Sequence, residues 1–213
     1  MVGSMHVHDL ILLRTVSAVI STQGDPACPN LNPNHRTWVV VRRGFISDGL
    51  IPVGVRGSQR HERCAGYTRF SEVVKIRRPD QLRLPLAEDS RRELQAFQSL
   101  SYLENHLVGL DMSWGPGGSV GYELASGVPA VRVDSDLDLI IVSHRKLDIA
   151  AAQDLWRVVS SAPGKVDTLV ETPFSGFSLE EFVTTSPREI LLRTSDGRIF
   201  GSNPWNLSSG KDS

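Results

Sequence analysis

Two segments decide the fold, and they read Gly117-Gly118-Ser119-Val120-Gly121 and Ser135-Asp136-Leu137-Asp138-Leu139-Ile140-Ile141-Val142. The second segment is apolar apart from its aspartates, which predicts a buried strand from Leu137 to Ser143. Side chains at positions i and i+2 of a strand point to the same face, so Asp136 and Asp138 are expected side by side, roughly 7 Å apart. The glycine-serine segment predicts a turn that opens a short helix ending near Gly127.

The paired aspartates predict a divalent metal site. Two carboxylates this close repel each other and lose hydration unless a cation lies between them. Mg²⁺ prefers oxygen ligands and keeps coordination positions open for water and phosphate, so we expect Mg²⁺ at Asp136 and Asp138. Upstream, the backbone N–H groups at Gly118 and the Ser119 hydroxyl are expected to bind phosphate oxygens. The alternative is that the aspartates only border a turn before a buried strand, and the glycine-serine segment argues against it.

This order of glycine-serine turn, helix and Asp-x-Asp strand resembles the polymerase-β type of nucleotidyltransferase, and the resemblance implies a third carboxylate from an adjacent strand. The strand predicted at Val166 to Thr172 offers two candidates. Asp167 is the first candidate because it stands at the start of this strand, and Glu171 is the second. The same resemblance implies that the site would hold two Mg²⁺ ions, which would activate a hydroxyl and stabilise a leaving pyrophosphate. The catalytic and metal-binding residues predicted from the sequence are therefore Asp136, Asp138 and Asp167.

The remaining patterns after residue 80 alternate between helix and strand. Apolar residues at three- and four-residue spacing predict a helix over residues 88–108, and Asp148 can cap a second helix. Ser178, with Glu181 three positions later, forms a capping box. Ser195-Asp196-Gly197 predicts a closing hairpin. Residues 81–213 are therefore predicted to form an α/β catalytic domain around a small sheet.

Residues 1–80 are predicted to form a separate β-rich domain. Runs of β-branched residues at 38–42, 50–55 and 72–76 predict strands. This part carries 11 Lys and Arg against 6 Asp and Glu. Because Arg56 and Arg60 lie near glycines and arginine binds phosphate bidentately, we expect both to contact a phosphorylated donor or an acidic carrier protein. A solvated basic face stays open as the alternative.

Composition places the chain among ordinary globular proteins, with 40% hydrophobic and 22% charged residues. No apolar run approaches the roughly 20 residues that span a bilayer, so we expect a cytoplasmic protein without membrane contact. Cys28 and Cys64 lie far apart, outside any metal or redox spacing, and are expected as reduced thiols. The basic residues are interspersed with glycine and apolar residues, which argues against nucleic-acid binding.

Longer motifs carry a resemblance to a known family. They include Trp114-Gly115-Pro116-Gly117-Gly118-Ser119-Val120-Gly121-Tyr122-Glu123-Leu124-Ala125-Ser126-Gly127, Pro52-Val53-Gly54-Val55-Arg56-Gly57, Glu171-Thr172-Pro173 and Asn203-Pro204-Trp205. A glycine-serine turn, a helix and an Asp-x-Asp strand, in that order, resemble the polymerase-β type of nucleotidyltransferase. Together the motifs resemble the phosphoribosyl-dephospho-CoA transferases, also called malonate decarboxylase holo-acyl-carrier-protein synthases. One departure is Gly117, which stands where a Thr is expected in the family's turn.

The resemblance implies a nucleotidyltransferase fold for the C-terminal domain and a defined reaction. A 2′-(5″-phosphoribosyl)-3′-dephospho-CoA group would pass from triphosphoribosyl-dephospho-CoA to a serine of the acyl carrier protein subunit of malonate decarboxylase, releasing pyrophosphate. One alternative is a nucleotidyltransferase with another acceptor, either the citrate lyase carrier protein or a small molecule. Another is a non-catalytic nucleotide- or nucleic-acid-binding module, which the clustered carboxylates disfavour because a binding module has no need of them.

Overall fold

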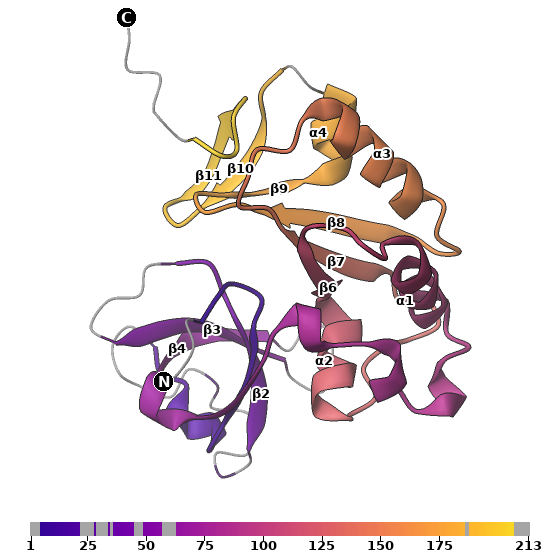
Figure 1. Ribbon diagram of the computed structural model, residues 1–213. Coiled ribbons are helices and arrows are strands. Elements are labelled where there is room, and N and C mark those ends of the chain that lie inside the picture. The colour runs from indigo at the N-terminus through magenta and orange to yellow at the C-terminus, as the bar shows by residue number, and fades with distance from the viewer. Residues whose placement is uncertain are drawn as a thin grey trace, which may run out of the picture. The chain divides into compact units, whose positions relative to one another are not determined.

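The computed structural model describes residues 5–21, 28, 34, 36–44, 49–56, 63–185 and 188–206. The chain divides into two compact units, Met1–Gln81 and Leu82–Ser213, both drawn in Figure 1. Strands dominate the first unit, whereas helices and strands alternate in the second. This composition confirms the predicted α/β class with a β-rich N-terminal part.

The first unit is an antiparallel sheet. Its strands within the described residues are β1 (Leu10–Leu13), β2 (Thr37–Val41), β3 (Leu50–Arg56), β4 (Arg63–Arg69) and β5 (Val73–Arg77). They lie in the order β4-β3-β2-β1-β5, and neighbouring strands pair antiparallel. Residues such as Ile11, Val39 and Val53 are almost completely buried and belong to the core of this unit.

Strands β2, β3 and β5 confirm the strands predicted from β-branched runs, while β1 and β4 are not predicted. β1 is apolar at every position, and β4 begins and ends with arginine and contains Gly66, so neither shows the alternation of a half-buried strand. β1 is held because it lies between β2 and β5, and β4 because it pairs with β3 along its whole length. Pairing with partners distant in sequence makes both of them strands.

The two cysteines, far apart in sequence, lie together in this unit. Cys28 is buried in the core, and Cys64 of β4 packs against the same core. Both are free thiols. Burial, followed by hydrogen bonding and charge from Cys64, raises the pKa of Cys28 to about 12. The Cys28 thiol is therefore protonated at neutral pH, and because the thiolate is the nucleophile it is expected to be unreactive.

The second unit is built on a mixed sheet. Its strands are β6 (Ser113–Pro116), β7 (Leu137–Val142), β8 (Val166–Glu171), β9 (Gly176–Ser178), β10 (Ile190–Thr194) and β11 (Gly197–Gly201). Among the described residues they lie in the order β11-β10-β9-β8-β7-β6, with β7 and β8 parallel. Leu137, Leu139 and Ile141 of β7 are completely buried, whereas Asp138 is partly exposed. The leucines and isoleucine thus face the core, and Asp138 faces the opposite side of the sheet.

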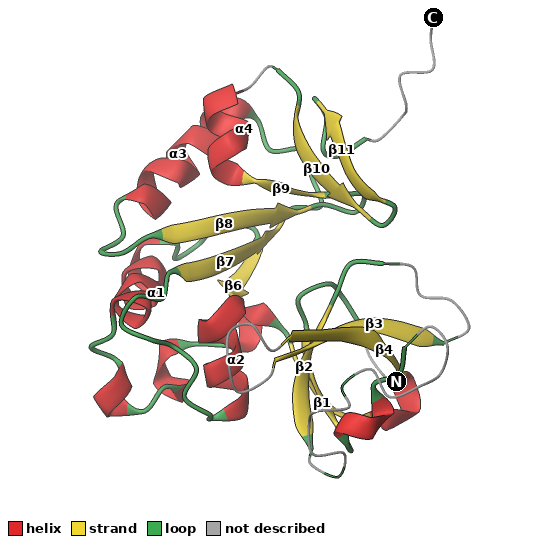
Figure 2. Ribbon diagram, turned by 180° about the vertical axis from the view of Figure 1, so that it is seen from behind, coloured by secondary structure: helices red, strands yellow, loops and turns green. Residues whose placement is uncertain are grey.

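Helices pack around this sheet. They are α1 (Gln95–His106), α2 (Gly118–Ser126), α3 (Ile149–Ser160) and α4 (Leu179–Thr185). α1 contacts β7 and α3, while α4 contacts α3, β8 and β9, as can be followed in Figure 2. α2 contacts β6 and β7. Within the described part of the chain, no helix is long and apolar enough to cross a membrane.

Side-chain caps begin two of these helices where the sequence predicts them. The Asp148 carboxylate accepts a hydrogen bond from the Ala151 N–H at 2.8 Å, at the start of α3. Ser178 Oγ accepts from the Glu181 N–H at 3.4 Å, at the start of α4. The Glu181 carboxylate accepts from the Leu191 N–H at 2.9 Å, which joins α4 to β10.

The helix predicted over residues 88–108 is wrong at its start. α1 begins at Gln95, and a separate 3-10 turn at Asp89–Arg91 precedes it. The turn and the helix are separate because Leu94 between them has an extended backbone, with φ of −66° and ψ of 137°. The predicted hairpin is confirmed, since β10 and β11 pair antiparallel and Thr194 faces Gly197 across the turn.

Candidate active site

The N-terminus of α2 lies against β7. The Gly117 N–H donates to the Asp138 carbonyl at 2.8 Å. Gly118 has a φ of 53°, and a Cβ atom there would lie 1.7 Å from Asp138 Oδ2. Glycine is therefore required at this position both by the backbone and by the neighbouring carboxylate. Ser119 follows in the first turn of α2, so the predicted phosphate-binding residues lie beside a predicted metal ligand.

Gly117, which stands where the family's turn is expected to have a threonine, lies close to side chains of β7. A Cβ atom at Gly117 would lie 3.1 Å from Ile140 Cγ1 and 3.7 Å from Asp138 Cβ. Since 3.1 Å is tighter than an ordinary carbon contact, Ile140 occupies space that a threonine at this position would need. A threonine at residue 117 would therefore require Ile140 to move by a few tenths of an ångström.

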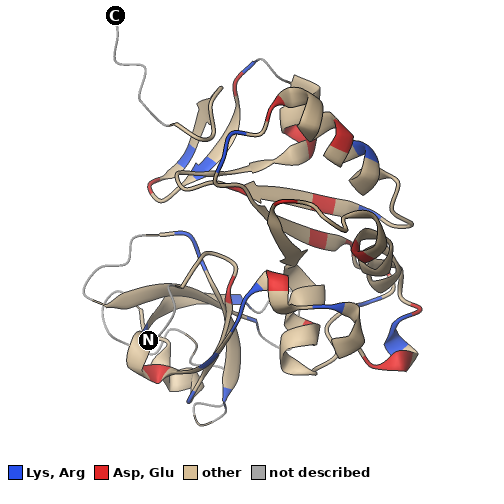
Figure 3. Cartoon of the chain, viewed as in Figure 1, with Lys and Arg blue, Asp and Glu red and all other residues tan. Residues whose placement is uncertain are grey.

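The pairing of β7 with β8 brings aspartates of two strands to one place. Asp138 of β7 is the direct parallel partner of Asp167 of β8, and neighbouring strands lie about 4.8 Å apart. Asp136 stands two residues before Asp138, just ahead of β7. Figure 3 shows acidic residues in red on these adjacent strands. The three aspartates predicted from the sequence therefore lie at the same end of the parallel pair.

Glu171, the alternative third carboxylate, lies elsewhere on β8. Its parallel partner is Val142, at the opposite end of β7 from Asp138. Four residues separate Glu171 from Asp167, which is roughly 13 Å along a strand. Glu171 is also only 7% exposed. Of the two candidates, Asp167 is the one that β8 places beside Asp138.

Lys165 was not predicted from the sequence and lies among these carboxylates. Its Nζ is 2.9 Å from Asp167 Oδ1 and 3.6 Å from Asp136 Oδ2. The hydrogen bond to Asp167 is the largest cause of a raised pKa for Lys165, and the charges of Asp167 and Asp136 act in the same direction. The sequence does contain one signal that could have predicted this contact. Lys165 precedes Asp167 by two residues, so both side chains lie on the same face of the strand.

The carboxylates suit a hard cation by their chemistry, but not by their present spacing. Among the described residues, no group of three or more His, Cys, Asp or Glu side chains is gathered closely enough to hold a metal ion. The ammonium of Lys165 contacts Asp136 and Asp167, so a positive charge already lies where these strands meet. The donor set fits Mg²⁺ in oxygen type. Movement of the Lys165 side chain would make two of these carboxylates available to it.

A buried ion pair supports this site from the side of α2. Glu123 of α2 is 6% exposed and accepts from Arg91 Nε at 2.6 Å and from Arg91 Nη2 at 3.0 Å. The same carboxylate accepts from the N–H groups of Ala130 and Val131 at 2.6 and 2.7 Å. Arg91 Nη2 also donates to the Val131 carbonyl at 2.6 Å. These bonds fasten α2 to the loop that leads to Asp136.

Hydrogen bonding keeps this pair ionised despite its burial. Burial alone would raise the pKa of Glu123, but the hydrogen bonds from Arg91, Val131 and Ala130 outweigh it and lower the pKa. The pKa of Arg91 is raised, chiefly by its hydrogen bond to Glu123. Sequence patterns gave no sign of this pair, because the two residues lie on separate elements and meet only when α2 packs.

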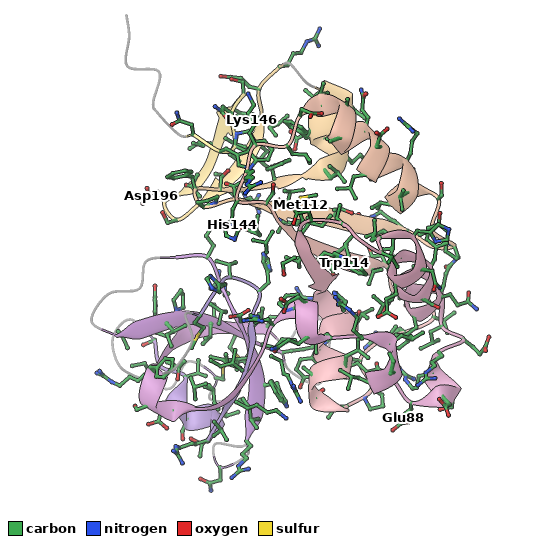
Figure 4. All side chains as sticks on the ribbon, in the orientation of Figure 1. Glu88, Met112, Trp114, His144, Lys146 and Asp196 are labelled. Carbon is green, nitrogen blue, oxygen red and sulfur yellow. The ribbon has the colours of Figure 1, made fainter. Side chains whose placement is uncertain are left out.

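The tryptophans of the family motifs have packing roles. Trp205 Nε1 donates to the Ser143 carbonyl at 3.1 Å, and its ring meets Phe177 edge-on at 5.3 Å between centroids. Trp114 of β6, labelled in Figure 4, is 8% exposed, and the Arg83 guanidinium lies 4.7 Å from its ring centroid. Buried aromatic rings and a cation over a ring contribute to packing. Both tryptophans therefore hold the second unit together.

The predicted basic contact residues belong to the first unit. Arg56 is the last residue of β3 and is partly exposed. Arg60 lies outside the described residues. Their contact with a donor or a carrier protein stays a prediction.

Comparison with known proteins identifies the family of the chain. Residues 6–79 match the family model of the phosphoribosyl-dephospho-CoA transferase MdcG N-terminal domain, and residues 81–211 match that of the C-terminal domain. The chain belongs to the phosphoribosyl-dephospho-CoA transferase family. The resemblance drawn from the motifs is thereby confirmed. The two matches meet near residue 80, where the structure also divides into its two units.

Phosphoribosyl-dephospho-CoA transferases from several bacteria are similar over most of the chain. That of Klebsiella pneumoniae (strain 342) is 33% identical over 211 residues, which cover 93% of this chain and 95% of the relative. That of Pseudomonas fluorescens (strain Pf0-1) is 32% identical over 206 residues, 97% of each protein. That of Pseudomonas putida (strain W619) is 33% identical over 169 residues, 79% of this chain and 80% of the relative. No solved structure matches the chain.

Proposed function

We propose that this chain transfers the 2′-(5″-phosphoribosyl)-3′-dephospho-CoA group from triphosphoribosyl-dephospho-CoA to a serine of the malonate decarboxylase acyl carrier protein, releasing pyrophosphate. The observation that carries the proposal is the register of β7 and β8, which sets Asp138 beside Asp167 with Asp136 two residues earlier. Close contact between Asp138 and Gly118 at the start of α2 supports it. Family membership supports the identity of the transferred group.

Each of these residues has a defined task in such a transfer. The N–H groups at the start of α2 and the Ser119 hydroxyl bind the donor's triphosphate, because a helix N-terminus favours anions. Asp136 and Asp138 hold Mg²⁺, which when bound neutralises charge on the phosphates. Asp167 is the third ligand, which helps to hold the metal near the attacking hydroxyl and accepts the proton of that hydroxyl. We assign Arg56 and Arg60 to contact with donor phosphates or with the acidic carrier.

The chemistry of the step is a single displacement at phosphorus. The carrier's serine oxygen forms a bond to the α-phosphorus of the donor, while the bond from that phosphorus to the β-phosphate oxygen breaks. The serine proton passes to Asp167, and the electron pair of the broken bond leaves with pyrophosphate. Since no side chain of the enzyme acts as the nucleophile, the enzyme acts by positioning and by stabilising charge. This is the chemistry of the polymerase-β-type nucleotidyltransferases, to which we assign the second unit.

Intact mass spectrometry of the carrier protein tests the proposal. The purified chain is incubated with triphosphoribosyl-dephospho-CoA, Mg²⁺ and unmodified malonate decarboxylase carrier protein, and released pyrophosphate is measured in parallel. We expect the carrier to gain the mass of one prosthetic group, with equimolar pyrophosphate, and neither product in the presence of a chelator. A carrier that stays unmodified would overturn the proposed acceptor. Modification of the citrate lyase carrier protein alone, in a parallel reaction, would establish the alternative acceptor.

A further inference from the structure

Lys165 joins two carboxylates that come from different strands. Its Nζ lies 2.9 Å from Asp167 Oδ1 and 3.6 Å from Asp136 Oδ2. The Leu137 N–H donates to the Lys165 carbonyl at 3.0 Å, so Asp136 and Lys165 occupy equivalent places just before two parallel strands. This arrangement places the Lys165 ammonium in contact with carboxylates of the predicted site.

Stability does not account for this lysine. The Lys165 side chain is 69% exposed, and its partners Asp136 and Asp167 are 41% and 48% exposed. Ion pairs this exposed contribute little to folding, because water screens them and ordering a long side chain costs entropy. The effect of the ammonium is local instead, since it offsets repulsion between carboxylates that the register of β7 and β8 brings together.

The same position makes Lys165 a competitor of a divalent cation. A metal ion bound by Asp136 and Asp167 would lie within a few ångströms of the ammonium, and like charges at that distance repel. Lysine has a flexible four-carbon stem, and here it is exposed, so the ammonium can leave without disturbing the fold. A metal ion that arrives with an anionic donor brings compensating negative charge, whereas a metal ion that arrives alone does not.

We infer that Lys165 is a positioning residue that substitutes for Mg²⁺ in the metal-free enzyme and opposes metal binding until the triphosphate donor is present. The inference rests on the proposed function in one respect, because it takes Asp136 and Asp167 as metal ligands. Lys165 neutralises the aspartates in the resting enzyme and withdraws from them when the donor and the metal enter together. Metal binding is thereby coupled to donor binding.

Metal titration without donor tests the inference directly. Mn²⁺ is titrated into the wild-type protein and into Lys165→Met at one pH, and bound metal is measured by electron paramagnetic resonance. Lys165→Met keeps the length of the side chain and removes its charge, so we expect it to bind Mn²⁺ about tenfold more tightly or better. Lys165→Arg keeps the charge and should bind Mn²⁺ as the wild-type protein does.

A matched control removes one positive charge elsewhere in the same unit. Lys146, labelled in Figure 4, is an exposed lysine in the loop between β7 and α3. Lys146→Met should leave Mn²⁺ affinity unchanged, which separates a local effect of Lys165 from an effect of net charge. A second readout is the rise in melting temperature on adding Mg²⁺ to protein in chelator, which should be larger for Lys165→Met than for the wild type.

The outcomes distinguish this inference from the proposed function. Equal or weaker Mn²⁺ affinity in Lys165→Met, or no binding in either protein, would overturn the role of Lys165. An equal gain in Lys146→Met would overturn it as well. Neither measurement involves the carrier protein, so failure to modify the carrier would refute the proposed function and leave the metal result to be judged separately.

Discussion

Two groups of carboxylates in the second unit make opposite uses of the same chemistry. The Glu123 carboxylate is almost completely buried and accepts from Arg91 and from two backbone N–H groups. The aspartates before and on β7 and β8 are partly exposed, and two of them share the exposed ammonium of Lys165. The Glu123 carboxylate has its hydrogen bonds supplied by fixed groups of the protein. Asp136 and Asp167 are instead paired with the ammonium of Lys165, which can move away.

The difference in burial assigns a structural role to Glu123 and a ligand-binding role to the aspartates. A buried carboxylate with all its partners supplied has no capacity for a ligand, and its loss leaves the partly buried Arg91 and two backbone N–H groups without their acceptor. Partly exposed carboxylates with a displaceable partner keep that capacity, and their loss costs the fold little. Variants of the aspartates should therefore change turnover without changing stability, and variants of Glu123 should do the reverse.

The largest expected effect comes from Asp138→Asn. Neutralising this carboxylate removes an oxygen ligand of full charge, so we expect turnover to fall by several orders of magnitude. The melting temperature should stay near that of the wild type, because Asp138 is partly exposed. Pyrophosphate release and thermal unfolding are measured on the same preparation. Turnover at the wild-type rate would show that Asp138 does not hold the metal.

Gly118→Ala should come next in size. The added Cβ would lie 1.7 Å from Asp138 Oδ2, so the carboxylate must move, and a displacement of about 1 Å can cost a hundredfold in rate. Gly127→Ala is the matched control, because Gly127 ends the same helix with φ of 71°, and a methyl group added there would meet no described neighbour within 4 Å. Both variants share the backbone strain of a positive φ, but only Gly118→Ala should lose turnover. Equal turnover in the two variants would contradict the contact.

Glu123→Ala should act on stability. It leaves Arg91, which is 24% exposed, without its carboxylate partner, and breaking a buried ion pair costs about 3 kcal/mol at the lower end of the usual range. Asp154→Ala is the control, because its pair with Arg157 is exposed on both sides and should cost less than about 1 kcal/mol. Urea unfolding measures both. A Glu123 variant as stable as the Asp154 variant would remove the structural role of the pair.

The smallest effect is the pH dependence of the same pair. The pKa of Glu123 is lowered in the folded protein, so its contribution to stability is fully present above the ordinary glutamate pKa of about 4.3. That contribution is lost as the pH falls through the folded-state pKa. Between pH 6 and pH 3 the wild type should therefore lose more unfolding free energy than Glu123→Gln. Parallel losses in the two proteins would show that Glu123 titrates as an ordinary carboxylate.

Local sequence determined the elements that carry the site. The apolar run after Asp138, the glycine before Ser119 and the cap at Asp148 each act within a few residues of themselves, so β7, α2 and α3 could be predicted with the facing of Asp136 and Asp138. The start of α1 was predicted wrongly, because the apolar spacing continues through Leu94, whose extended backbone interrupts the helix. β1 and β4 were missed because their pairing partners are distant in sequence.

The sequence by itself therefore determined the fold class, the family and the two aspartates of the Asp-x-Asp segment. Only the tertiary structure decided that Asp167 stands beside Asp138 while Glu171 does not, because strand register depends on how β8 pairs with β7 as well as on the residues of β8. It alone placed Lys165 between carboxylates of two strands. Periodicity reports which face a side chain takes, whereas charges that meet across strands depend on contacts between residues far apart in the chain.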